Sequence, residues 1–167
     1  MEELIVKNIS QDFFNDFGTV IKIPKEGERK PTLNTDSFKH YAELGFLDCN
    51  DIVEFGITTF KKRDYNVLQL EQHAKTPEFL FAIDGAFIMP VAPITYKNGE
   101  AYPNLDKIIA IKVEQGEGVI FKDGIWHFAP YPYDKEKSSV LVGFKKGTCY
   151  EDIVIKDLDK KYKMIFK

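Results

Sequence analysis

The stretch LEQHAKTPEFLFAIDG, residues 70–85, decides the fold together with GEGVIFKDGIWH, residues 116–127. On a β-strand, side chains two residues apart point to the same face. Glu71 and His73 are therefore predicted to share one face of a strand, while Leu70 takes the other. A carboxylate beside an imidazole on one wall, joined by groups from later strands, can bind a metal or move protons.

Short strand-like segments, rich in β-branched and aromatic residues, fill most of the chain around these two stretches. They are residues 52–60, 65–73, 78–83, 86–92, 107–113, 119–121, 138–144 and 153–155. Turn residues separate them, and Asp84-Gly85 is the dipeptide favoured in a two-residue hairpin turn. One short helix is predicted near the N-terminus, with Ser10 as its N-cap and Gly18 at its left-handed end. This pattern predicts an all-β fold, a sandwich or barrel.

The amino-acid composition is typical of a packed protein and argues against several classes of partner. A chain of 167 residues with 44% hydrophobic residues is expected to form one domain over residues 1–167. Its formal net charge of −3 argues against a nucleic-acid partner, which usually requires a basic face. No apolar run is long enough to span a membrane, and the N-terminus lacks the features of a secretion signal. Cys49 and Cys149 are isolated thiols, so a cytoplasmic location is expected.

The spacing of the two stretches resembles the two-part signature of the cupin superfamily. The first part of that signature is H-x-H, three or four residues, E, six residues and G. Here Glu71 stands at the first histidine, and His73, Glu78 and Gly85 match. The second part is G, five residues and P-x-G-x-x-H. Gly116, Gly124 and His127 match it, while Lys122 replaces the proline. The resemblance implies a cupin-type β jelly roll or barrel that follows the short N-terminal helix.

Most of the chain also resembles a narrower family, the ureidoglycolate lyases. Leu70-Glu71-Gln72-His73 stands where that family reads L-E-R-H, and Gly124-Ile125-Trp126-His127 stands where it reads G-x-W-H. His40 is similar to a histidine in the family's early R-Y-H segment. The chain departs from the family where Glu78 replaces a glutamine and where Phe144-Lys145 replaces an aspartate-arginine pair. Arginine holds a carboxylate bidentately, so its loss bears on how this chain would bind an acidic substrate.

The resemblance implies a lyase that releases urea and glyoxylate from ureidoglycolate or a closely related small hydroxy or amido acid. It implies catalytic roles for Glu71, His73 and His127, and substrate contacts from Glu78, Trp126, Lys145 and His40. Glu71, His73, Glu78 and His127 also form a reasonable ligand set for a divalent transition metal. The expected partners are a small-molecule substrate and a second copy in a homodimer.

Each of these residues also has a structural interpretation. His73 and His127 can be hydrogen-bonded core residues, and Glu78 can lie on the surface after the Thr76-Pro77 turn. Trp126 can be core packing or a pocket wall, while His40 and Lys145 can be surface residues. A second function also stays open, because one fold hosts many functions. It is a non-catalytic or differently specific cupin that binds a small molecule.

Overall fold

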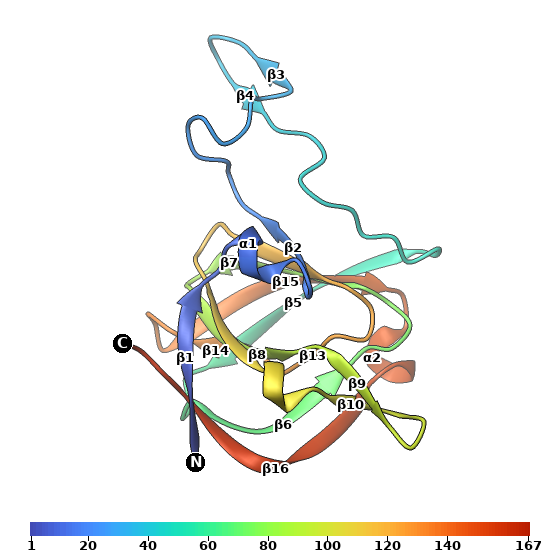
Figure 1. Cartoon of the computed structure of the whole chain (residues 1–167). Helices are drawn as coiled ribbons and strands as arrows, with labels where there is room; N and C mark the ends of the chain where they lie inside the picture. Colours follow the sequence, from blue (N-terminus) through green and yellow to red (C-terminus); the bar gives the residue numbers. More distant parts are fainter.

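The computed structural model describes all 167 residues and is dominated by β-strands (Figure 1). Its strands are β1 (Glu2–Asn8), β2 (Gly18–Ile21), β3 (Leu33–Asn34), β4 (Lys39–His40), β5 (Val53–Lys61), β6 (Asn66–Gln72), β7 (Glu78–Asp84), β8 (Phe87–Ala92), β9 (Ile94–Lys97), β10 (Glu100–Pro103), β11 (Ile109–Val113), β12 (Gly118–Phe121), β13 (Trp126–His127), β14 (Tyr131–Pro132), β15 (Lys137–Lys145) and β16 (Val154–Ile165). Two short helices, α1 (Gln11–Phe14) and α2 (Thr148–Glu151), and one 3₁₀ turn (Leu105–Lys107) complete the chain. The predicted all-β fold with a short N-terminal helix is confirmed.

The larger sheet closes on itself as a six-stranded barrel. Its strands follow the order β11-β1-β16-β6-β13-β8, and β8 pairs with β11 to complete the ring. Strand β14 pairs with β8 outside this ring. A closed barrel leaves no free strand edges, because each strand is paired on both sides.

A five-stranded sheet, in the order β2-β12-β7-β15-β5, packs against one wall of the barrel. Two cores result. Leu80 of β7 and Met89 of β8 belong to the core between this sheet and the barrel. Leu70 of β6 and Trp126 of β13 belong to the core inside the barrel. Strand alternation explains the division, because successive residues of one barrel strand point to the two different cores.

A long excursion of the chain, residues 22–52, joins β2 to β5 and is called the arm below. It reaches away from the barrel and carries the small β3–β4 ribbon near its tip (Figure 1, blue to cyan). Not one residue from 21 to 66 is buried. The arm therefore adds nothing to either core.

Two of the local predictions are wrong. Helix α1 ends at Phe14, and Gly18 begins β2, where a side chain would meet the carbonyl oxygen of Ile120 at 1.9 Å. Asp84-Gly85 does not close a hairpin, because β7 belongs to the five-stranded sheet and β8 to the barrel. The left-handed φ of 78° at Gly85 instead lets the chain cross from one sheet to the other. No helix is long and apolar enough to span a membrane.

Candidate functional site

A cavity of about 490 Å³ opens between the five-stranded sheet and the barrel wall. Its volume lies in the range typical of small-molecule sites. Its titratable lining residues are Glu54, Glu71, His73, Glu78, His127 and Cys149, and its apolar lining residues include Phe55, Ile57, Phe60, Leu80, Val142 and Phe144. No lysine or arginine lines it.

Both sheets contribute to the polar end of this cavity. Glu71 of β6 and His127 of β13 lie opposite each other on paired barrel strands. His73 follows β6 directly, and Glu78 opens β7 of the facing sheet after the Thr76-Pro77 turn. The first motif therefore crosses from the barrel to the five-stranded sheet, which brings its histidine and its second glutamate face to face.

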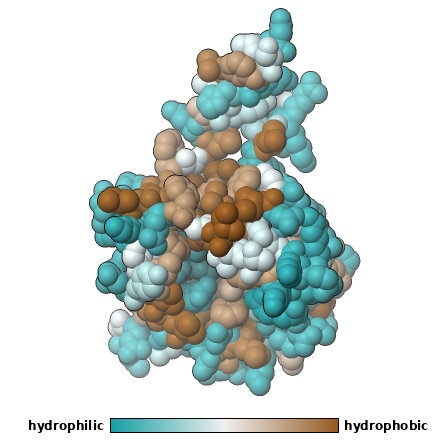
Figure 2. Space-filling model, turned by 180° about the vertical axis from the view of Figure 1, so that it is seen from behind, coloured by the Kyte–Doolittle hydropathy of each residue, from teal (hydrophilic) through white to brown (hydrophobic).

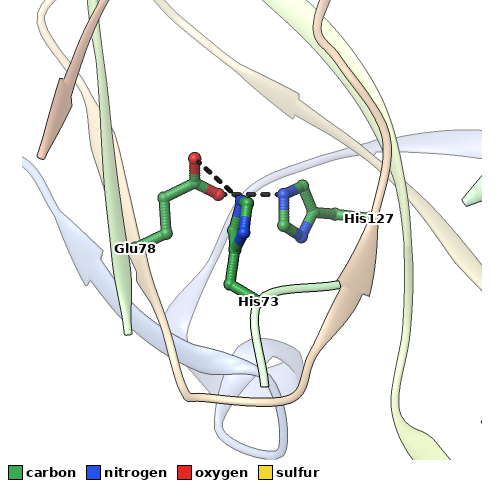
Figure 3. A group of neighbouring side chains, drawn as sticks. All are labelled: His73, Glu78 and His127. Carbon is green, nitrogen blue, oxygen red and sulfur yellow. Dashed lines mark ion pairs between the residues drawn. The ribbon is translucent and has the colours of Figure 1, made fainter. Parts of the chain in front are cut away.

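His73, Glu78 and His127 form one buried group whose side chains point toward one another (Figure 3). One ligand atom from each lies within 4.8 Å of the others. Nε2 of His127 is 2.9 Å from one carboxylate oxygen of Glu78, and Nε2 of His73 is 3.8 Å from the other. Both imidazoles thus present Nε2 to the same carboxylate.

Backbone carbonyls fix the orientation of both rings. Nδ1 of His73 lies 2.6 Å from the carbonyl oxygen of Asp152, and Nδ1 of His127 lies 3.2 Å from that of Ile125. A carbonyl only accepts hydrogen bonds, so each Nδ1 carries a proton and donates it. In the neutral imidazole, the Nε2 lone pair of each ring then points into the cavity, which is the arrangement that histidine ligands of metals show.

The contact between Glu78 and His127 is short but poorly directed. The buried Oε2 of Glu78 has no hydrogen bond of acceptable geometry, although Nε2 of His127 lies 2.9 Å away. The distance supports a strong electrostatic contact, although the contact falls short of good hydrogen-bond geometry. When both imidazoles are neutral, a buried carboxylate oxygen without a well-directed donor and the two Nε2 lone pairs beside it fit a bound cation. These residues therefore match the chemistry of a divalent transition-metal site.

The charges within the group shift the pKa values in opposite directions. Burial on its own would raise the pKa of Glu78, but the neighbouring His127 and His73 outweigh it and lower that pKa below its usual range. Burial would likewise lower the pKa of His127, but the carboxylates of Glu78 and Glu71 outweigh it and raise that pKa. In the metal-free protein the pair is therefore stabilised as carboxylate and imidazolium.

Glu71 lies beside this group without belonging to it. Its carboxylate is 3.8 Å from Nε2 of His127, and its side chain is 23% exposed, compared with 8% for Glu78. Burial raises the pKa of Glu71, the carboxylate of Glu78 raises it further, and His127 and His73 oppose the shift. Glu71 is thus the carboxylate with access to the open part of the cavity.

Aromatic rings surround the two imidazoles. Phe121 stacks on His127 with ring centroids 5.1 Å apart and planes 10° apart. The ring of Phe144 packs against that of His73, with ring centroids 6.0 Å apart. These rings exclude water from one side of each imidazole and so strengthen the electrostatic contacts of the group.

The structure does not bring Trp126, Lys145 or His40 into the cavity. Trp126 precedes His127 on β13 and therefore points into the barrel core, where its side chain is fully buried. Lys145 ends β15 and contacts Asp51 at 3.2 Å outside the cavity. His40 is exposed on β4 of the arm.

Two residues that shape the site, Asp152 and Phe144, are not among the residues predicted from the sequence motifs. Asp152 accepts hydrogen bonds from the backbone N–H groups of Ala74 and Lys75, and its own carbonyl holds the ring of His73. No motif marks it, because it lies far along the chain from the residues that it positions. Phe144 was visible as the residue beside Lys145, and strand alternation would have placed one of the two in the cavity.

Comparisons with known proteins support the sequence-based assignment. The model of the family described as ureidoglycolate lyase matches residues 1–163. No curated protein matches the chain. Oxalate decarboxylase from Bacillus subtilis is similar at 16% identity and a TM-score of 0.40, over 65% of this chain and 24% of that one. Procruciferin, an 11S globulin from Brassica napus, is similar at 13% identity and a TM-score of 0.39, over 64% of this chain and 22% of that one.

The chain thus spans about a quarter of the length of the solved structures that it resembles. The family match differs from these likenesses in extent, because it covers nearly all of this chain. With that match, the chain belongs to the ureidoglycolate lyase family.

Proposed function

We propose that this protein releases urea and glyoxylate from ureidoglycolate or a closely related small hydroxy or amido acid. The observation that carries the proposal is the convergence of Glu71, His73, Glu78 and His127 at one end of a cavity of about 490 Å³. Family membership supplies the reaction class, and the cavity supplies room for a small substrate.

The reaction needs one group that takes a proton and one that gives a proton. The central carbon of ureidoglycolate carries a hydroxyl, a carboxylate and a urea nitrogen. Loss of the hydroxyl proton forms the carbonyl of glyoxylate as the carbon–nitrogen bond breaks. The bonding electrons move to the nitrogen, which takes up a proton and leaves as urea. No oxidant and no water molecule is consumed.

Glu71 suits both proton transfers. It lies in the cavity with partial exposure, and it stands outside the group of His73, Glu78 and His127. A carboxylate whose pKa burial has raised can take the hydroxyl proton and then deliver the same proton to the leaving nitrogen. One residue can therefore balance the reaction.

His73, Glu78 and His127 would hold a divalent transition metal. When bound, such an ion polarises the substrate hydroxyl and lowers its pKa. The residues themselves orient the site, because the carbonyls of Asp152 and Ile125 fix both imidazoles. Phe121 and Phe144 keep water away from the rings.

The charge of the cavity limits how the substrate carboxylate can bind. Glu54, Glu71 and Glu78 line the cavity, and no lysine or arginine does. The positive groups available there are the His127 imidazolium and a metal ion bound nearby. We therefore propose that the substrate anion binds only when one of these supplies a counter-charge.

We also propose that the protein works in the cytoplasm as a homodimer. Cys49 and Cys149 are free thiols, which suits a reducing compartment. The family resemblance supports the dimer.

Product analysis tests the function. Racemic ureidoglycolate is incubated with the protein, with EDTA or with added Mn²⁺ or Zn²⁺, and corrected for spontaneous decay. The proposal expects urea and glyoxylate in equal amounts and no ammonia. Release of ammonia would indicate hydrolysis of the ureido group instead.

The absence of a cationic side chain in the cavity favours one alternative, a small-molecule-binding cupin with a different ligand. In that case ureidoglycolate would decay at the rate of buffer alone. A neutral ureido compound would then bind more tightly than ureidoglycolate in calorimetric titrations.

A further inference from the structure

The outer face of the five-stranded sheet is apolar across its whole width. Two rows of residues cross all its strands in register. The first is Ile21, Gly118, Phe81, Leu141 and Ile57, and the second is Thr19, Ile120, Phe79, Gly143 and Phe55. Their strand neighbours Leu80 and Val142 face the inner core, so both rows face outward. Neither row contains a charged residue.

Glycines make this face flat. A side chain at Gly118 would meet the ring of Phe81 at 2.8 Å, and one at Gly143 would meet the ring of Phe55 at 2.7 Å. The rings of Phe81 and Phe55 therefore each cover a glycine of the neighbouring strand. The rings of Phe79 and Phe81 stack along β7 at 6.1 Å. The result is a flat apolar surface.

Much of this surface is open. Phe55 is 64% exposed and Ile57 is 66% exposed, while Phe79, Phe81 and Leu141 are half-buried. Seen from behind, hydrophobic surface gathers below the base of the arm (Figure 2). Monomeric soluble proteins seldom expose contiguous apolar patches of more than a few hundred Å², and larger patches mark interaction sites.

We propose that this outer face is the interface with a second copy of the chain, packed face to face about a two-fold axis. An isologous interface uses one patch twice, and a flat apolar face without charges is complementary to itself. Two sheets packed in this way lie about 10 Å apart, as in β-sandwiches. The absence of charge on the rows argues against nucleic acid or a charged peptide as the occupant.

The dimensions of the face suit a stable dimer. Five strands span about 20 Å, and the nine residues of β15 and β5 extend about 30 Å, which gives roughly 600 Å² of flat area. A standard interface buries about 800 Å² per partner. The arm borders the same face, because Gly45 lies against Ile21 and Ile120, and it can supply the remainder. Ile23 and Phe46 of the arm are 79% and 74% exposed.

The interface would also complete the candidate site. Phe55 and Ile57 belong to the apolar rows and also line the cavity, at the unpaired edge strand β5. A second copy that covers them would close the side of the cavity at this edge and exclude water from it. This link to the cavity rests on the function proposed above, whereas the interface itself does not.

Sedimentation velocity on the wild-type protein at 1 to 50 µM tests the interface without reference to activity. The proposal expects a species of twice the 19.2 kDa chain mass. A monomer throughout this range would overturn it. Flotation of such a monomer with phosphatidylcholine or phosphatidylserine vesicles would identify a lipid surface as the occupant instead.

Two variants locate the surface. Leu141→Asp puts a charge within the first row, between Phe81 and Ile57, and Leu68→Asp makes the same change at a 50% exposed leucine on β6 of the barrel. Leu141→Asp should be monomeric and Leu68→Asp dimeric. If both variants are dimeric, the interface does not lie on this face and the proposal is overturned.

Hydroxyl-radical labelling of the wild type covers the case in which Leu141→Asp does not fold. Dilution should increase the labelling of Phe55, Phe79 and Phe81, while Tyr96 on β9, which is 67% exposed, should label equally at all concentrations. Labelling of the three phenylalanines that does not change while a dimer dissociates would place the interface elsewhere.

Discussion

Nε2 of His127 lies 2.9 Å from Oε2 of Glu78, yet that buried oxygen receives no well-directed hydrogen bond. Nε2 of His73 approaches the other oxygen of the same carboxylate at 3.8 Å. Three potential metal ligands thus lie close together without forming well-directed hydrogen bonds to one another. The contact between Glu78 and His127 stabilises the metal-free protein as an ion pair, and under the proposed function it would give way to ligation of a cation.

A divalent transition metal should stabilise the wild-type protein. Binding to the folded state alone adds about 2.7 kcal/mol at a metal concentration 100 times Kd. Glu78→Gln should lose most of this gain, while Glu71→Gln should keep it, because Glu71 stands outside the ligand group. Thermal unfolding of each variant with and without Mn²⁺ or Zn²⁺ measures how much stability the metal adds. Equal stabilisation of the two variants would show that Glu78 is not a ligand.

The ion pair of Glu78 and His127 should give the metal-free protein a stability maximum in mildly acidic solution. The folded pKa of Glu78 is lowered, so its contribution is complete above its ordinary pKa of 4.5 and is lost as the pH falls through the folded pKa. The folded pKa of His127 is raised, so its contribution is complete below 6.5 and is lost as the pH rises through the folded pKa.

The measurement is the free energy of unfolding in urea at several pH values with EDTA present. Wild type minus the double variant Glu78→Gln/His127→Gln should be largest between about pH 4.5 and 6.5 and smaller on either side. A difference that is flat from pH 4 to 9 would show that the two residues are not charged partners.

Lys145→Ala should leave the lyase activity unchanged within about twofold. The ammonium group of Lys145 pairs with Asp51 outside the cavity at 42% exposure, and exposed ion pairs contribute little. Steady-state kinetics with ureidoglycolate provide the check. A rise in KM of tenfold or more would mean that Lys145 moves to the substrate carboxylate on binding.

Trp126→Ala should act on stability and much less on substrate binding. Trp126 is fully buried in the barrel core, on the opposite side of β13 from His127. Truncation of a buried tryptophan costs about 3–5 kcal/mol. Urea unfolding gives the loss in stability, and KM measured well below the unfolding midpoint should change by less than threefold. The reverse pattern, a stable protein with a greatly raised KM, would place Trp126 in the binding site.

The strand pattern predicts an all-β sandwich or barrel, and the resemblance to the cupin signature adds the jelly roll or barrel and the residues at the centre of the candidate site. Strand alternation predicts that Glu71 of β6 and His73, the residue directly after β6, point to one side, and the second motif supplies His127. The same rule, applied one residue further, separates Trp126 from His127 and Lys145 from Phe144. The positions of Trp126 and Lys145 outside the cavity could therefore be predicted from the sequence.

Other features depend on contacts between distant parts of the chain. Asp84-Gly85 has the turn chemistry of a hairpin, but the same left-handed glycine also serves a crossing between sheets. Asp152 acts on His73 from the far end of the chain. The apolar rows of the outer face exist only once the register of all five strands is known.

The proposed lyase function is tested by the rate of urea release from ureidoglycolate, measured side by side for the wild type, Glu71→Gln and His127→Ala. We expect the wild type to exceed spontaneous decay and both variants to lose about 10²-fold or more in kcat. Circular dichroism of each variant controls for folding, and Lys145→Ala, a substitution outside the cavity, serves as the control that should keep its activity. A wild-type rate equal to that of buffer would rule out the lyase function, and a folded Glu71→Gln variant with full activity would rule out Glu71 as the group that transfers the proton.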